Sequence, residues 1–61
     1  SEDEEREQKL AALDGEYSQK ISDVETEMAK ANAIGDDEYL NALKAERETL
    51  VSEYTTKRGE I

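Results

Sequence analysis

The two halves of this 61-residue chain carry their large side chains in mirrored order. Seven residues of the first half pair with seven of the second so that the two residue numbers always add up to the same value: Leu10/Ile61, Asp14/Lys57, Tyr17/Tyr54, Ile21/Leu50, Val24/Arg47, Met28/Leu43 and Ala31/Leu40. Within each half, the intervals between successive paired residues alternate between three and four. This spacing keeps one stripe of a helix against a partner helix. Two antiparallel helices folded about a single turn must show such a constant sum. The pattern therefore predicts an all-α fold, an antiparallel two-helix hairpin or coiled coil.

The turn is expected at Gly35-Asp36, midway between the paired positions. Glycine just after a helix adopts the left-handed conformation without a Cβ clash and commonly ends the helix. An aspartate that follows it is suited to cap the next helix. At the other end of the chain, Ser1 with Glu4 three residues later has the form of a capping box. We expect helices at about 2–33 and 37–58, in a single helical-hairpin module that covers residues 1–61.

Two further glycines bear on the helix boundaries. Gly59 is expected to end the second helix and to leave the last two residues frayed. Gly15 lies inside the first helix, where glycine costs about 1 kcal/mol relative to alanine. A break at Asp14-Gly15 would give a three-helix bundle, which is the alternative fold. Against it, the three-four spacing continues across Gly15 and places this residue on the outer face.

The predicted seam between the helices is mostly apolar. Its large side chains are Leu10, Tyr17, Ile21, Val24, Met28, Leu40, Leu43, Leu50 and Tyr54. Asp14 opposite Lys57 places a polar layer in this seam, and such layers commonly fix the register of a coiled coil. Tyr17 faces Tyr54, and we expect the two rings to pack with both hydroxyls at the solvent edge.

Beside the seam, Arg47 has an acidic neighbourhood. We expect its aliphatic stem to lie along Val24 and its guanidinium to reach Glu27 or Glu46. This contact would relieve the repulsion between the two glutamates, which the hairpin register brings together.

Charge and composition restrict the function. The formal net charge of −9 at pH 7 repels nucleic-acid phosphates and anionic membrane surfaces, so we expect neither as a partner. Histidine and cysteine are absent, which removes the usual zinc ligands and thiol chemistry. We expect no enzyme activity, no catalytic residues, no cofactor and no metal. Without a signal-peptide pattern or a run of about 20 apolar residues, we expect a cytoplasmic location or a place within a macromolecular assembly.

The expected turn carries a cluster of acids at its tip: Asp36, Asp37 and Glu38. Helix capping and compensation of the helix dipole explain them most simply. The run of Gly35-Asp36, further acids, Tyr39 and Ala42 also resembles the tip of Gre-type transcript cleavage factors. In that family an antiparallel coiled coil carries acids into the secondary channel of RNA polymerase and holds a magnesium ion there. The resemblance is confined to residues 35–42 and departs from the family in the spacing between the first acid and the tyrosine, so no catalytic residues are carried across.

Four apolar residues outside the seam indicate where a partner binds. We expect Leu13, Ile34, Tyr39 and Val51 to contact a protein partner or a second copy, for example in a dimer of hairpins. The chain is then a non-catalytic structural or assembly protein: a scaffold, an adaptor or a chaperone-like subunit, for instance of a virus particle or secretion apparatus. One alternative is a regulatory coiled-coil finger that presents the acidic tip to a large enzyme such as RNA polymerase. Another is a segment that is disordered alone and becomes helical on a partner.

Overall fold

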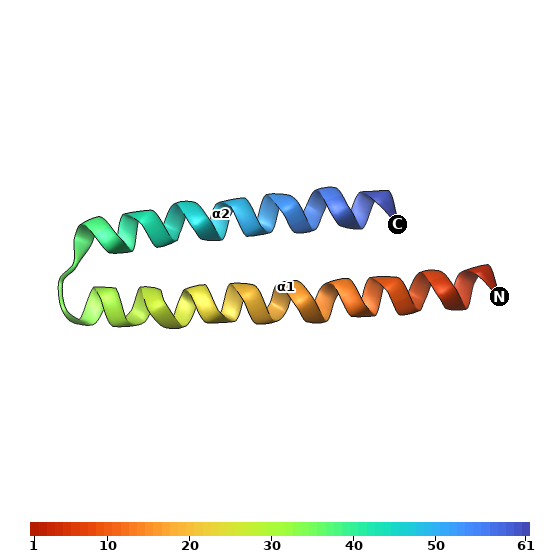
Figure 1. The fold of residues 1–61 in the computed structure, drawn as a ribbon, viewed down its shortest axis with the longest axis horizontal. Helices are drawn as coiled ribbons and strands as arrows, with labels where there is room; N and C mark the ends of the chain where they lie inside the picture. Colours follow the sequence, from red (N-terminus) through yellow and green to blue (C-terminus); the bar gives the residue numbers. More distant parts are fainter.

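The computed structural model describes residues 1–61 as two long helices, α1 (Glu2–Ala33) and α2 (Asp37–Glu60). They lie side by side and antiparallel, joined by a short turn at one end (Figure 1). The Cα trace extends 51 Å along the helices but only 16 Å and 7 Å in the other two directions. The predicted two-helix hairpin is therefore confirmed. Its shape is a flat plate with two broad faces.

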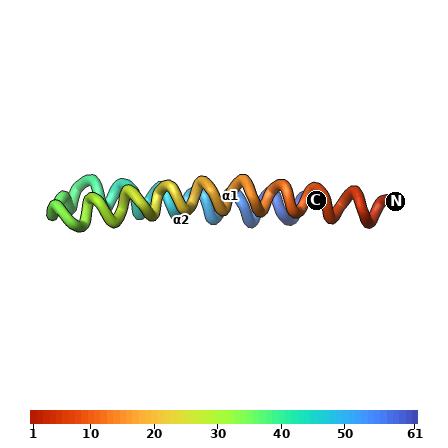
Figure 2. The backbone as a smooth tube through the Cα atoms, turned by 90° about the horizontal axis from the view of Figure 1, so that it is seen from below, coloured from red at the N-terminus to blue at the C-terminus, as the bar shows by residue number.

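The two helices cross at a shallow angle. When the plate is viewed edge-on, α2 lies on one side of α1 near the turn and on the other side near its own C-terminal end (Figure 2). Because α1 is longer, its N-terminal turns project beyond the end of α2 (Figures 1 and 2). A small crossing angle of this kind lets side chains of one helix fill the gaps of the other along the whole shared length.

The turn between the helices is a Schellman motif followed at once by an N-cap. Gly35 has a φ of 72°, and its N–H donates to the carbonyl of Asn32 at 3.2 Å. The Asp36 N–H donates to the carbonyl of Ala31 at 2.9 Å, which completes the motif. The Asp36 carboxylate then accepts from the N–H of Tyr39 at 3.1 Å and caps α2. The backbone of Asp36 thus caps the C-terminal end of α1, and its side chain caps the N-terminal end of α2.

Helix α1 runs without a break through Gly15. The alternative three-helix bundle is therefore wrong. A Cβ built on Gly15 would meet no atom within 4 Å, as expected for a position on the outer face. The prediction that Gly59 ends the second helix is also wrong, since α2 continues to Glu60. Only Gly35 has a positive φ, so Gly59 stays in an ordinary helical conformation.

The core is a thin line between the helices. Four residues are buried: Tyr17, Val24, Ala31 and Leu43. Met28, Leu40 and Leu50 pack against the last three of these, so the densest part of the core lies in the half nearer the turn. Towards the open end, Tyr17 is buried, whereas Leu10, Ile21 and Tyr54 are only half-buried. With four buried residues out of 61, this fold has little apolar burial to stabilise it.

Candidate interaction surface

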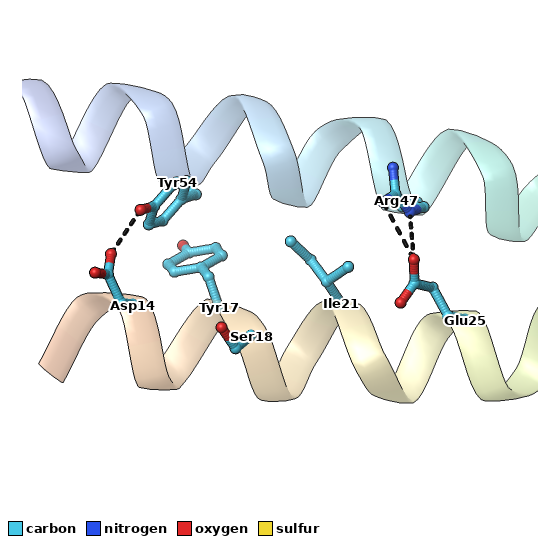
Figure 3. A pocket seen from close by; sticks show the side chains of 7 residues that line it. All are labelled: Asp14, Tyr17, Ser18, Ile21, Glu25, Arg47 and Tyr54. Atoms are coloured by element: carbon cyan, nitrogen blue, oxygen red, sulfur yellow. Dashed lines mark hydrogen bonds and ion pairs between the residues drawn. The ribbon is translucent and has the colours of Figure 1, made fainter. Parts of the chain in front are cut away.

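The three tyrosines of the chain form the main polar contacts between the helices. Each hydroxyl donates to a carboxylate of the opposite helix: Tyr17 to Glu53 at 3.2 Å, Tyr39 to Glu27 at 3.3 Å and Tyr54 to Asp14 at 2.6 Å. Figure 3 shows the Tyr54–Asp14 bond and the Tyr17 ring directed between the helices. The rings of Tyr17 and Tyr54 pack in a tilted arrangement with their centroids 5.8 Å apart.

The expectation that both hydroxyls lie at the solvent edge is wrong for Tyr17. Its side chain is 1% exposed and its hydroxyl binds Glu53, an acceptor that the sequence reasoning missed. Two ammonium groups cover the ring, Lys20 at 5.1 Å and Lys57 at 5.3 Å from its centroid, which is within cation–π distance. A buried tyrosine therefore lies between two cations and a carboxylate.

Asp14 and Lys57 are both exposed, and no ion pair joins them. Asp14 is bound instead to the Tyr54 hydroxyl, and Lys57 lies over the Tyr17 ring. A hydrogen bond with the Tyr17 hydroxyl is the main cause that raises the pKa of Lys57 above its ordinary value of 10.5, and the electrostatic effect of Tyr17 adds to it. Each of these two charged side chains therefore contacts a tyrosine of the same layer. The role of Asp14 and Lys57 in fixing the register stays a prediction.

Two tyrosines that border carboxylates, Tyr39 and Tyr54, have a pKa above the ordinary value of 10.0. For Tyr54 the main cause is the hydrogen bond to Asp14, followed by loss of hydration and by the charge of Asp14. Arg58 nearby acts in the opposite direction. For Tyr39, loss of hydration comes first and the charge of Glu27 second. In both cases the neutral phenol is the form that the hairpin favours.

Arg47 makes the one ion pair that bridges the two helices. Its Nε and a terminal guanidinium nitrogen both lie 3.2 Å from the Glu25 carboxylate. The expected contact with Glu27 or Glu46 is wrong, because Glu27 is already bound to Tyr39 and Lys30. The guanidinium turns to the opposite broad face, where Glu25 has no other partner.

A shallow groove runs between the helices on this face. It encloses about 500 Å³ and is lined by Asp14, Tyr17, Ser18, Ile21, Glu25, Arg47 and Tyr54 (Figure 3). Its charged groups already bind partners within the hairpin: Asp14 binds Tyr54, and Glu25 binds Arg47.

The four candidate contact residues differ in exposure. Ile34 is 78% exposed at the turn, Tyr39 43% and Val51 39%, whereas Leu13 is half-buried. Tyr39 also uses its hydroxyl within the hairpin. The apolar surface available to a partner therefore lies mainly at Ile34, at Val51 and on the ring of Tyr39.

The acids of the tip have different surroundings. Asp36 caps α2, while Asp37 and Glu38 are exposed and form no ion pair. No group of three or more potential ligands is close enough together to hold a metal ion. The tip is thus a short acidic turn beside the exposed side chain of Ile34.

Neither helix combines the length and the apolar character that crossing a membrane requires. No family model, curated protein or solved structure matches this chain.

Proposed function

We propose that this chain is a non-catalytic structural or assembly module, a helical hairpin that mediates protein–protein interaction. It would act as a scaffold, adaptor or chaperone-like subunit, in the cytoplasm or within a larger assembly such as a virus particle or secretion apparatus. Its partner is a protein, either a second copy or another chain, and neither nucleic acid nor a membrane.

The observation that carries this proposal is the balance between exposed and buried apolar side chains. Ile34, Tyr39 and Val51 are large and exposed, while only four residues of the whole chain are buried. A partner that covers these side chains adds apolar burial of about 25 cal/mol per Å² to a fold that has little of its own. The open groove is shallow, and its charged groups bind one another, which favours a contact surface over a catalytic site.

Capture of partners by the tagged hairpin tests the proposal. Ile34→Ser combined with Val51→Ser removes two exposed apolar side chains without changing the net charge. We expect this variant to lose proteins that the wild-type hairpin captures from its native source, identified by mass spectrometry. The matched control is Ala12→Ser with Ala45→Ser, two exposed positions on the outer sides of the helices. Equal capture by all three proteins, with helicity unchanged in circular dichroism, would contradict the proposal.

A second candidate function is a regulatory finger that presents its acidic tip to a large enzyme. It is favoured by the unpaired charges of Asp37 and Glu38 beside Ile34, the most exposed large apolar side chain. Reversal of Asp37 and Glu38 to lysine tests it, with Asp36 retained because it caps α2. Loss of partner binding with helicity retained would favour the finger, and unchanged binding would eliminate it.

A further inference from the structure

The apolar contacts of the hairpin are concentrated beside the turn, in residues 21–50, which we call the turn half. Three of the four buried residues of the chain form one cluster there: Val24, Ala31 and Leu43. Three partly buried side chains pack against this cluster: Met28, Leu40 and Leu50. The turn also joins the two helical segments of this half covalently (Figure 1). The turn half is therefore held both by apolar packing and by chain connectivity.

The rest of the hairpin consists of two free arms, residues 2–20 and residues 51–61. The arms have fewer apolar contacts, because Tyr17 is their one buried residue while Leu10, Leu13 and Ile61 are half-buried. Both arms end freely, and the N-terminal turns of α1 project beyond α2 (Figure 1). Separation of the arms can therefore begin at the free ends with the turn and its apolar cluster intact.

The polar contacts between the arms are confined to one layer. The Tyr54 hydroxyl donates to Asp14 at 2.6 Å (Figure 3), and the Tyr17 hydroxyl donates to Glu53 at 3.2 Å. Lys57 of α2 lies over the Tyr17 ring, 5.3 Å from its centroid. Between this layer and the free ends, no hydrogen bond or ion pair joins the two helices. The tyrosine layer is thus the one polar link between the arms.

From this arrangement we infer that the two arms part as one unit while the turn half stays folded, and that the tyrosine layer is the latch that holds them together. Regions with few buried apolar contacts open at a lower free energy than the core of a protein. Single helices of this length are marginal in water, so the parted arms also lose helical structure. Parting uncovers Tyr17, which is 1% exposed in the closed hairpin. The latch goes beyond the proposed function and does not depend on it, since it acts within one molecule.

Native-state hydrogen exchange of the purified full chain, followed by NMR at increasing urea concentration, tests the latch. We expect the backbone amides of residues 12–20 and 51–58 to exchange at least about tenfold faster than those of residues 25–33 and 42–50. Urea should accelerate exchange less in the arms, because their parting exposes less surface than unfolding of the whole chain. Equal rates with equal urea dependence in both parts would overturn the inference, and so would a chain without protected amides.

Two tyrosine variants test the latch itself. Tyr54→Phe removes the hydroxyl that binds Asp14 and keeps the ring. Because this bond exists only in the closed hairpin, its loss should speed exchange in the arms by about three- to tenfold. The matched control is Tyr39→Phe, which removes the bond to Glu27 inside the turn half. That bond persists when the arms part, so the exchange rates of the arms should stay as in wild type.

The two variants separate parting of the arms from unfolding of the whole chain. Arms that exchange no faster in Tyr54→Phe would overturn the assignment of the latch. Arms that exchange faster in Tyr39→Phe would show that they open only together with the turn half, which also overturns the inference. The capture experiment above tests the proposed function separately, so each of the two can fail without the other.

Discussion

At the scale of single residues, two large aliphatic side chains of similar size differ strongly in burial. Leu43 is 5% exposed and lies in the centre of the core, whereas Ile34 is 78% exposed at the turn. Leu43→Ala should reduce the free energy of unfolding by about 2–5 kcal/mol, enough to unfold much of so small a fold. Ile34→Ala should change it by less than about 0.5 kcal/mol. Urea titration followed by circular dichroism compares the two, and similar losses would contradict the placement of the core.

The tyrosine–carboxylate contacts predict a loss of stability at alkaline pH. In the unfolded chain Tyr54 ionises near 10.0, and in the hairpin its pKa is higher because its hydroxyl binds Asp14. The stabilisation is therefore complete below about pH 10 and is lost as the pH rises through the folded-state pKa. Tyr39 and Lys57 have raised pKa values and act in the same direction.

Thermal unfolding at a series of pH values between about 8 and 12 measures this effect. Tyr54→Phe should be less stable than wild type at pH 8, and its further loss on the way to pH 12 should be smaller. A variant with the same alkaline loss as wild type would show that the Tyr54–Asp14 bond does not contribute.

At the scale of the elements, two glycines should respond to alanine with opposite signs. Gly35 has a positive φ, which costs an L-residue about 1–2 kcal/mol, so Gly35→Ala should destabilise the hairpin. Gly15 lies within α1 with open space around its Cα, so Gly15→Ala should stabilise it by about 1 kcal/mol. Neither added Cβ would meet another atom within 4 Å, so the two effects are those of the backbone. Denaturant titration of both variants checks the signs, and destabilisation by Gly15→Ala would contradict a continuous α1.

The helices and their turn could be predicted because they depend on periodic patterns. Heptad spacing defines which side of each helix faces the other, and Gly35-Asp36 combines a left-handed glycine with a capping carboxylate. The partner of Arg47 could not be predicted in the same way. The hairpin register offers several glutamates near this long side chain, and in the structure Arg47 binds Glu25 while Glu27 accepts from Tyr39. Gly59 shows a similar limit, since glycine permits the end of a helix without requiring it.

At the scale of the whole molecule, the thin core predicts that association adds to the stability of the hairpin. Only four residues are buried within one hairpin, while the large apolar side chains of Ile34, Tyr39 and Val51 are exposed. A contact made only by folded molecules stabilises them by mass action, so the melting temperature should rise with protein concentration. If the partner of the proposed function is a second copy, we expect this rise in wild type between micromolar and millimolar concentration and a smaller rise in Ile34→Ser/Val51→Ser. Added salt tests the contribution of charge repulsion within one chain. In dilute solution it should raise the melting temperature, because it screens repulsion within a chain of net charge −9. A melting temperature that is independent of concentration in wild type would mean that the hairpin folds alone and does not bind a second copy.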